Sequence, residues 1–495
     1  MKLQRRRLLQ AAAAAPWLGS CAVLRGGMPP PLPREFRGAW VATVANIDWP
    51  SRPGLPTALQ RQEMHALLAQ AQAIGLNAIV LQVRPSADAI YPSELEPWSE
   101  YLSGTSGQPP DEPWDPLAEW IVAAHALGLE LHAWFNPYRA RHSQARSAPA
   151  ATHVLNTEPD IVRAYGDQSW MDPAEPRAAG RLLAVVRDVL QRYDVDGVHI
   201  DDYFYPYPVR DAQGTELPFP DNAPWQRHLR AGGEPDRAAW RRAQVDALVE
   251  RLAATVHAAK PWVRVGVSPF GLPRPDRRPA GIEGFSQYDK LHADVERWLA
   301  EGWLDYLAPQ LYWPIGQAAQ AFAVLQDAWR AGNPLQRHIW PGLFTSRLGA
   351  ERTAYDAAEV LAQVELTRHP GAVNDGHLHF SMIALLQDRD GIATRLRQGP
   401  YAQAALTPAT PWLDEPPPRP PVFDWRPQSR ELTVAQGEGA PLRQAVLWIE
   451  PPEGWRWQAL PMPADKALRV AANARTAWLI GIGRSGLESR AVQVF

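Results

Sequence analysis

The sequence predicts an α/β fold: a (β/α)8 TIM barrel followed by a small C-terminal all-β sandwich of the fibronectin-III or immunoglobulin-like kind. Eight short apolar runs alternate with stretches of helical period, which is the pattern of parallel strands linked by helices. A Pro-rich stretch then interrupts the chain, and short alternating runs without helical period follow it. We therefore predict a signal peptide at 1–21, a barrel at 33–402, a linker at 403–421 and a sandwich at 422–495.

Each predicted barrel strand is a short, mostly apolar run. In chain order the strands are GAWVATV from Gly38, NAIVLQV from Asn77, LELHAWF from Leu129, DGVHI from Asp196, VRVGVSPF from Val263, LDYLAPQLYW from Leu304, HIWPGLF from His338 and HLHFSMIAL from His377. Between them apolar residues recur at helical spacing, as in 59–74, 182–190 and 240–256, and Gly75 suits the position that ends the first helix. An open doubly wound sheet is the alternative, but no Gly-rich phosphate loop follows the first strand.

The C-terminal segment has a different pattern. The linker contains PATPWLDEPPPRPP, which cannot form a helix because proline lacks the backbone N–H. The runs QAVLWIE, ALRVAA, AWLIGIG and AVQVF follow, and they are typical of short antiparallel strands. We expect this small domain to act as a spacer or packing module rather than as the catalytic part.

The N-terminus has the features of an export signal rather than of folded structure. Lys2 and the arginines at 5–7 form a basic region, and an Ala-rich apolar stretch follows. LGSC, which ends at the only cysteine of the chain, resembles a bacterial lipobox, so we expect Cys21 to be lipidated. Ala22 favours an outer-membrane lipoprotein that faces the periplasm. The arginine run resembles a twin-arginine signal, and Sec export stays open.

The composition argues against a nucleic-acid partner. A net charge of −3 over 495 residues provides no basic surface for a polyanion. No further segment reaches the roughly 18 apolar residues of a membrane-spanning helix, so the lipid alone would hold the protein at the membrane. The 22 Trp and 13 Tyr residues supply flat rings that can stack on sugars, which favours a glycan polymer as the partner.

The sequence VDGVHIDDYFYP, from Val195, carries the strongest chemical signal. Its apolar run ends in two adjacent carboxylates, Asp201 and Asp202, where a parallel barrel strand would place reactive groups. Glycoside hydrolysis uses a pair of carboxyl groups around an oxocarbenium-like transition state. Strand alternation places His199 and Asp201 on the inward face, so we expect Asp201 at the anomeric centre. The proton donor stays open among Asp202, Asp88 and Glu283, as does the stereochemistry.

Polar and aromatic side chains at the other predicted strand ends complete the candidate site. The expected substrate-binding residues are Arg84, Asp88, Trp134, Asn136, Tyr138, Arg139, His199, Tyr203, Tyr205, Gln310, Tyr312 and Trp313. For Arg84 and Arg139 the alternative role is an ion pair that holds a loop, and for Trp134 it is barrel filling. No HxH or HExxH spacing accompanies His199, so the sequence predicts neither a metal nor another cofactor.

Six segments of the chain carry a family resemblance. They are EFRGAWVATVANIDWPS at Glu35, LQVRPSADAIYPSELEPWSEYLSG at Leu81, AHALGLELHAWFNPYRA at Ala124, DGVHIDDYFYPYP at Asp196, VGVSPFG at Val265 and GWLDYLAPQLYW at Gly302. Together they resemble the glycosyl hydrolase-like family 10, bacterial envelope lipoproteins that include an enzyme cleaving denuded peptidoglycan strands. The resemblance implies a (β/α)8 barrel, an envelope location and hydrolysis of peptide-free glycan. One departure is WMDPAEPRA at Trp170, where the family usually has Gly and Asn after Asp-Pro.

We therefore expect an envelope lipoprotein that hydrolyses the glycan strands of denuded peptidoglycan through its carboxylates. One alternative keeps this mechanism and exchanges the substrate for an exopolysaccharide of amino sugars. A second alternative is a lipoprotein without catalytic activity that binds glycan through the same aromatic and carboxylate side chains.

Overall fold

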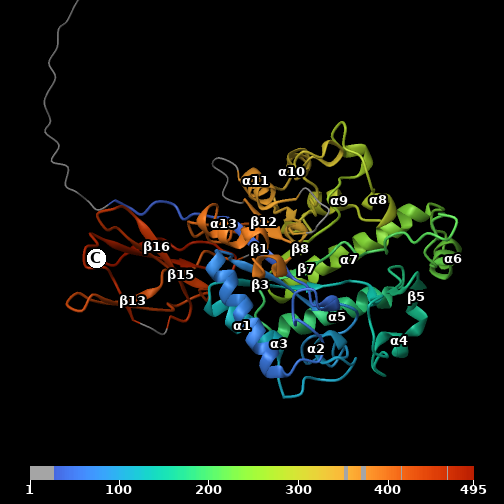
Figure 1. Ribbon diagram of the computed structural model, residues 1–495, viewed down its shortest axis with the longest axis horizontal. Coiled ribbons are helices and arrows are strands. Elements are labelled where there is room, and N and C mark those ends of the chain that lie inside the picture. Colours follow the sequence, from blue (N-terminus) through green and yellow to red (C-terminus); the bar gives the residue numbers. More distant parts are fainter. Residues whose placement is uncertain (1–26, 350–354, 369–374, 414, 465–466) are drawn as a thin grey trace, which may run out of the picture.

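The computed structural model describes residues 27–349, 355–368, 375–413, 415–464 and 467–495, so Cys21 and the predicted signal peptide lie outside the described residues. Within these ranges, nine parallel strands form one curled, TIM-barrel-like sheet with helices around it (Figure 1). Their order in the sheet is β10-β9-β8-β7-β3-β2-β1-β12-β11. The strands are β1 (Phe36–Val41), β2 (Ala78–Arg84), β3 (Glu130–Phe135), β7 (Gly197–Ile200), β8 (Arg264–Val267), β9 (Tyr306–Leu307), β10 (His338–Ile339), β11 (Gly342–Leu343) and β12 (Gly376–His379).

The two ends of this sheet belong to one stretch of chain. β10 pairs with β9, and β11, two residues further along the chain, pairs with β12. The Trp340 amide donates to the Leu307 carbonyl at 2.8 Å, and the Pro341 carbonyl accepts from the Leu378 amide at 3.0 Å. The predicted seventh strand is therefore bonded on both sides but broken in the middle, where Pro341 has no N–H to donate.

Two other predicted strands are shorter than expected. The sixth is reduced to β9 with an isolated bridge at Gln310, because Pro309 interrupts its ladder. The eighth ends at His379, and its apolar continuation forms helix α12 instead of strand. The Asp48 carboxylate accepts the Ile383 amide of α12 at 2.7 Å, and such a contact from a distant residue cannot be read from local sequence.

Helices pack on the outside of the curled sheet (Figure 1). α1 ends where Gly75 adopts a φ of 101°, which confirms the predicted helix end. α5 buries the predicted apolar stripe at 182–190 in the main hydrophobic core and packs against α7. None of the helices among the described residues is both long and apolar enough to cross a membrane. The helices are α1 (Thr57–Ile74), α2 (Glu100–Ser103), α3 (Pro116–Ala126), α4 (Val154–Thr157), α5 (Pro176–Arg192), α6 (Asn222–Arg230), α7 (Arg237–Ala259), α8 (Gln287–Lys290), α9 (Val295–Ala300), α10 (Phe322–Ala331), α11 (Ala357–Thr367), α12 (Met382–Leu386) and α13 (Ile392–Gln398).

Polar rings occupy the interior of the curled sheet. His132 of β3 and Tyr306 of β9 are fully buried there. A Cβ on Gly197 would lie 2.5 Å from the His132 ring, and a Cβ on Gly266 would lie 1.9 Å from the Tyr306 ring. Glycine is therefore needed at both positions to make room for these rings.

The C-terminal part of the chain is all-β and built from antiparallel sheets. One apolar cluster joins residues of both sheets, including Leu432 and Val434 on one side and Leu447 and Leu479 on the other. The fibronectin-III or immunoglobulin-like assignment and the domain boundaries stay predictions. One sheet has β13 (Val422–Arg426), β14 (Glu431–Ala435) and β17 (Leu468–Arg469); the other has β16 (Arg456–Pro461), β15 (Gln444–Ile449), β18 (Ala477–Ile482) and β19 (Val492–Gln493).

Candidate active site

A cavity of about 280 Å³ opens at the carboxyl ends of the parallel strands, where TIM-barrel enzymes place their active sites. Side chains on or just after β1, β2, β3, β7, β8 and β9 converge on it. Its lining consists of Trp40, Ala42, Val44, Ile47, Gln82, Trp134, Arg139, His142, Asp201, Asp202, Tyr203, Tyr207, Ser268, Gln310, Tyr312 and Phe380. The cavity therefore combines two carboxyl groups with several aromatic rings.

Asp201 directly follows β7 and is 3% exposed. Its carboxyl group accepts hydrogen bonds from Trp134 Nε1 at 3.1 Å and from Asn136 Nδ2 at 3.1 Å. Burial, with a contribution from the neighbouring Asp202 carboxylate, raises the pKa of Asp201 to about 7, although Arg139 and the two hydrogen bonds oppose this shift. A substantial fraction of Asp201 therefore carries a proton at neutral pH.

Asp202 lies in the same cavity but has different partners. The Tyr207 hydroxyl donates to its Oδ2 atom. Burial raises the pKa of Asp202, while hydrogen bonds from Tyr207 and from the Gln310 side chain counteract that rise. The two adjacent carboxyl groups thus have unequal surroundings, and a pair of this kind is able to separate the roles of acid and base.

Aromatic rings line the remainder of the cavity. The Arg139 guanidinium lies 4.3 Å from the centre of the Tyr203 ring, a cation–π distance. Tyr312 packs against Phe344 with ring centres 4.8 Å apart, and Tyr207 packs against Phe285 at 5.2 Å. These contacts hold the rings in fixed positions, where exposed faces or edges can meet the apolar faces of sugars.

Most of the predicted site residues meet at this cavity. Asp201, Asp202, Trp134, Arg139, Tyr203, Gln310 and Tyr312 line it. Asn136 and His199 are fully buried immediately behind it. Asn136 bonds directly to Asp201, whereas His199 Nε2 is 2.9 Å from the hydroxyl of Ser268, a lining residue.

Five other predicted substrate contacts lie neither in the lining nor directly behind it. Arg84 is fully buried and donates to both oxygens of Glu96 at 2.7 Å, which agrees with the alternative ion-pair role. Asp88 is buried where it accepts the Ser86 amide at 2.7 Å. Tyr138 and Tyr205 are buried in the main hydrophobic core, and the partly buried Trp313 packs against that core.

Glu283, another candidate proton donor, also lies away from the cavity. Glu283 is exposed in a loop, and like Asp88 it does not line the cavity. Of the three candidates, only Asp202 shares the cavity with Asp201.

Several lining residues were missed by sequence reasoning. Tyr207 belongs to the same aromatic run as Tyr203, but its contact with Asp202 depends on the turn that follows β7. Trp40 lies within the predicted first strand and Phe380 within the predicted eighth. Strand alternation could have placed these two rings on the inward face.

The position of this carboxyl pair on a TIM-barrel-like scaffold is that of a glycosidase. Residues 35–357 match the family described as Glycosyl hydrolase-like 10, so the chain belongs to that family and is a glycosidase. It is 39% identical over 401 residues to glycosyl hydrolase YngK of Bacillus subtilis, covering 78% of this chain and 76% of that one. It is 33% identical over 350 residues to glycosyl hydrolase DigH of Escherichia coli K12, covering 66% and 77%.

Among solved structures, the chain is similar to the PgaB (BpsB) glycoside hydrolase domain from Bordetella bronchiseptica. The TM-score is 0.46 at 16% identity, covering 73% of this chain and 98% of that one. The endo-β-1,4-mannanase from Thermotoga petrophila gives a TM-score of 0.43 at 9% identity, covering 93% and 97%.

Proposed function

We propose that the protein hydrolyses the β-1,4 links of glycan strands in denuded, peptide-free peptidoglycan. The observation that carries the proposal is the buried carboxyl pair, in which Asp201 has a pKa near 7 while Tyr207 and Gln310 hydrogen-bond to Asp202. Family membership supports glycan hydrolysis, and the family resemblance supports the peptidoglycan substrate.

The two carboxyl groups take different roles in this proposal. Protonated Asp201 donates its proton to the glycosidic oxygen as the bond to the anomeric carbon breaks. Ionised Asp202 stabilises the positive charge that develops on the sugar ring. A water molecule supplies the hydroxyl of the new reducing end, and its remaining proton restores Asp201. Asp201 is therefore the acid, which revises the sequence-based expectation that it faces the anomeric centre as a carboxylate.

Surrounding residues hold this pair in place. Trp134 and Asn136 direct their N–H groups at Asp201, and the N–H donors orient the carboxyl group toward the cavity. Tyr203 and Tyr312 offer ring surface for sugar stacking. These aromatic surfaces suit the apolar faces of the sugar rings of a glycan strand.

We also propose that the mature protein is an envelope lipoprotein anchored through Cys21, most simply in the outer membrane and facing the periplasm. The lipobox-like LGSC sequence supports this assignment. Mass spectrometry of the protein purified from membranes tests it. A diacylglycerol adduct on an N-terminal Cys21 is expected, and a water-soluble mature protein without lipid would overturn it.

Release of soluble saccharides from sacculi tests the substrate. The protein lacking residues 1–21 is incubated with sacculi that were or were not treated with amidase, and products are identified by mass spectrometry. Fragments from amidase-treated sacculi alone are expected, with loss of activity in Asp201→Asn and full activity in the exposed control Asp167→Asn. Cleavage only of an amino-sugar exopolysaccharide, or sedimentation with sacculi without cleavage, would favour one of the two alternatives.

A further inference from the structure

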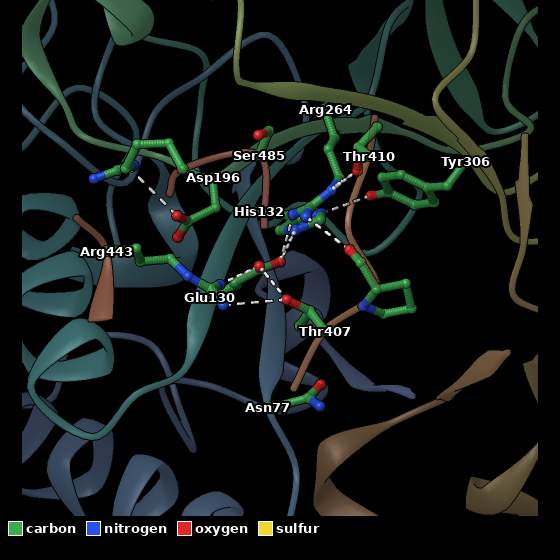
Figure 2. A network of polar contacts seen from close by, with 12 residues as sticks. Asn77, Glu130, His132, Asp196, Arg264, Tyr306, Thr407, Thr410, Arg443 and Ser485 are labelled. Carbon is green, nitrogen blue, oxygen red and sulfur yellow. Dashed lines mark hydrogen bonds and ion pairs between the residues drawn. The ribbon is translucent and has the colours of Figure 1, made fainter. Parts of the chain in front are cut away.

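A continuous chain of hydrogen bonds runs through the barrel interior below the cavity. Trp40 Nε1 lies 3.2 Å from His199 Nε2, and His199 Nδ1 lies 2.9 Å from the Tyr306 hydroxyl. The same hydroxyl lies 2.9 Å from His132 Nδ1, and His132 Nε2 lies 3.1 Å from Glu130 Oε2. Figure 2 shows the end of the chain that includes Tyr306, His132 and Glu130.

Donor and acceptor rules fix the direction of every bond in this chain. An indole N–H can only donate, so His199 Nε2 is an acceptor and its proton is on Nδ1. That N–H donates to Tyr306, whose own O–H is then available only for His132 Nδ1. His132 must in turn carry its proton on Nε2, from which it donates to Glu130. The bonds thus place the ring proton of His199 on Nδ1 and a ring proton of His132 on Nε2.

Glu130 fixes the far end of the chain. Its fully buried carboxylate accepts from Arg264 Nη1 at 2.8 Å, from Thr407 Oγ1 at 2.6 Å and from Arg443 Nη1 (Figure 2). Burial raises its pKa, but the two guanidinium groups and His132 outweigh burial and hold the pKa of Glu130 well below its usual range. Glu130 therefore stays an acceptor, and residues at the start of the C-terminal region help to keep it so.

The other end of the chain meets the cavity at Ser268. Ser268 Oγ lies 2.9 Å from His199 Nε2, the same unprotonated nitrogen that Trp40 contacts. The serine O–H must donate to this nitrogen, which leaves the lone pairs of Oγ as acceptors. Since Ser268 lines the cavity, these lone pairs are available to a hydroxyl or amide N–H of a bound sugar.

We infer that Glu130, acting through His132, Tyr306 and His199, is a positioning residue that makes Ser268 a hydrogen-bond acceptor for the glycan. The inference rests on the proposed glycan hydrolase function for its substrate, and on the geometry alone for its proton arrangement. The opposite direction would require Glu130 to donate and the indole N–H of Trp40 to accept, and neither is possible.

The variant Tyr306→Phe cuts the chain without removing a ring. Tyr401→Phe is a matched control, because the buried Tyr401 hydroxyl likewise joins two histidines, His377 at 2.5 Å and His379 at 2.8 Å, away from the cavity. Nitrogen-15 NMR of the protein lacking residues 1–21, without bound glycan, reports the tautomers of the histidine rings. In the wild type we expect His199 protonated on Nδ1 and His132 on Nε2.

In Tyr306→Phe the His199 Nδ1–H loses its buried acceptor while Trp40 still donates to Nε2, so we expect part of the His199 population to shift to the tautomer protonated on Nε2, which donates to Ser268 Oγ. The KM for glycan should rise by up to about fivefold, the loss of one neutral hydrogen bond, with kcat changing less. Ser268→Ala should give a similar rise, and combining it with Tyr306→Phe should add little. Tyr401→Phe should leave the His199 signals and KM unchanged.

Two results would overturn the inference. One is a wild-type His199 protonated on Nε2. The other is a Tyr306→Phe protein whose His199 tautomer and KM match those of the wild type. Because tautomers are read without substrate, a wrong substrate proposal would leave that half of the test intact. Glu130→Gln is the more direct variant, but it removes the charge that pairs with Arg264 and Arg443. If the Glu130→Gln protein does not fold, Tyr306→Phe still decides the test.

Discussion

Replacing Asp201 with asparagine should stabilise the protein at alkaline pH. The folded state raises the pKa of this carboxyl group from 3.8 to about 7, so between these values the native protein holds a proton that the unfolded chain has released. Stability is therefore lost as pH rises through this window. The shift of about three pKa units corresponds to about 4 kcal/mol above pH 7. Asparagine keeps the shape and remains neutral, and so avoids this cost.

Denaturant unfolding of wild type and Asp201→Asn at pH 4 and pH 8 measures the effect. At pH 4 both side chains are largely neutral in the folded state, and the two free energies of unfolding should agree within about 1 kcal/mol. At pH 8 the variant should be more stable by up to about 4 kcal/mol. Asp167→Asn, at an exposed position, should show no such difference. Equal stability of wild type and Asp201→Asn at pH 8 would refute the raised pKa and the acid role built on it.

Two further predictions concern neighbours of the carboxyl pair, and a third concerns the buried ion pair of Arg84 and Glu96. Tyr207→Phe removes a hydrogen-bond donor that lowers the pKa of Asp202, so the acidic limb of the pH profile of kcat/KM should move to higher pH. An acidic limb at the wild-type pH would contradict the contact between Tyr207 and Asp202. Trp134→Phe removes a hydrogen-bond donor that lowers the pKa of Asp201, so the alkaline limb of the same pH profile should move to higher pH. A shift of that limb to lower pH would count against Asp201 as the acid. Arg84→Met leaves the buried Glu96 carboxylate without its main partner and should lower the free energy of unfolding in denaturant by about 3–5 kcal/mol. Adding Glu96→Leu should recover most of this loss, because no buried charge then remains unpaired. A loss below about 1 kcal/mol for Arg84→Met would contradict the ion-pair role.

Local sequence pattern predicted the features that depend on local chemistry. The alternation of apolar runs and helical stretches indicated the curled parallel sheet, and the acidic end of β7 indicated the cavity. The break at Pro341 was also readable, since proline cannot donate to a strand ladder. Because side chains alternate along a strand, Asp201 could be placed on the inward face from the sequence alone.

Contacts between distant segments could not be predicted. Arg84 follows a strand and looks available for substrate, but Glu96 folds back onto it and makes it part of the core. The polar chain below the cavity needs side chains of β3, β7 and β9 to meet inside the curled sheet, although β8 lies between β7 and β9, and it also needs Arg443 from the C-terminal region. The proton on Asp201 likewise depends on burial that only the assembled site creates.

The acid role of Asp201 is tested most directly by the leaving group. Asp201→Asn and Asp202→Asn are compared on glycan strands and on an aryl glycoside of the product sugar. The aryl group of this second substrate leaves as a phenolate and needs no proton donor. We expect Asp201→Asn to lose about 10²- to 10⁴-fold in kcat/KM on glycan and to stay within about tenfold of wild type on the aryl glycoside. Asp202→Asn should lose activity on both. If Asp201→Asn were equally impaired on both substrates, Asp201 would not be the proton donor.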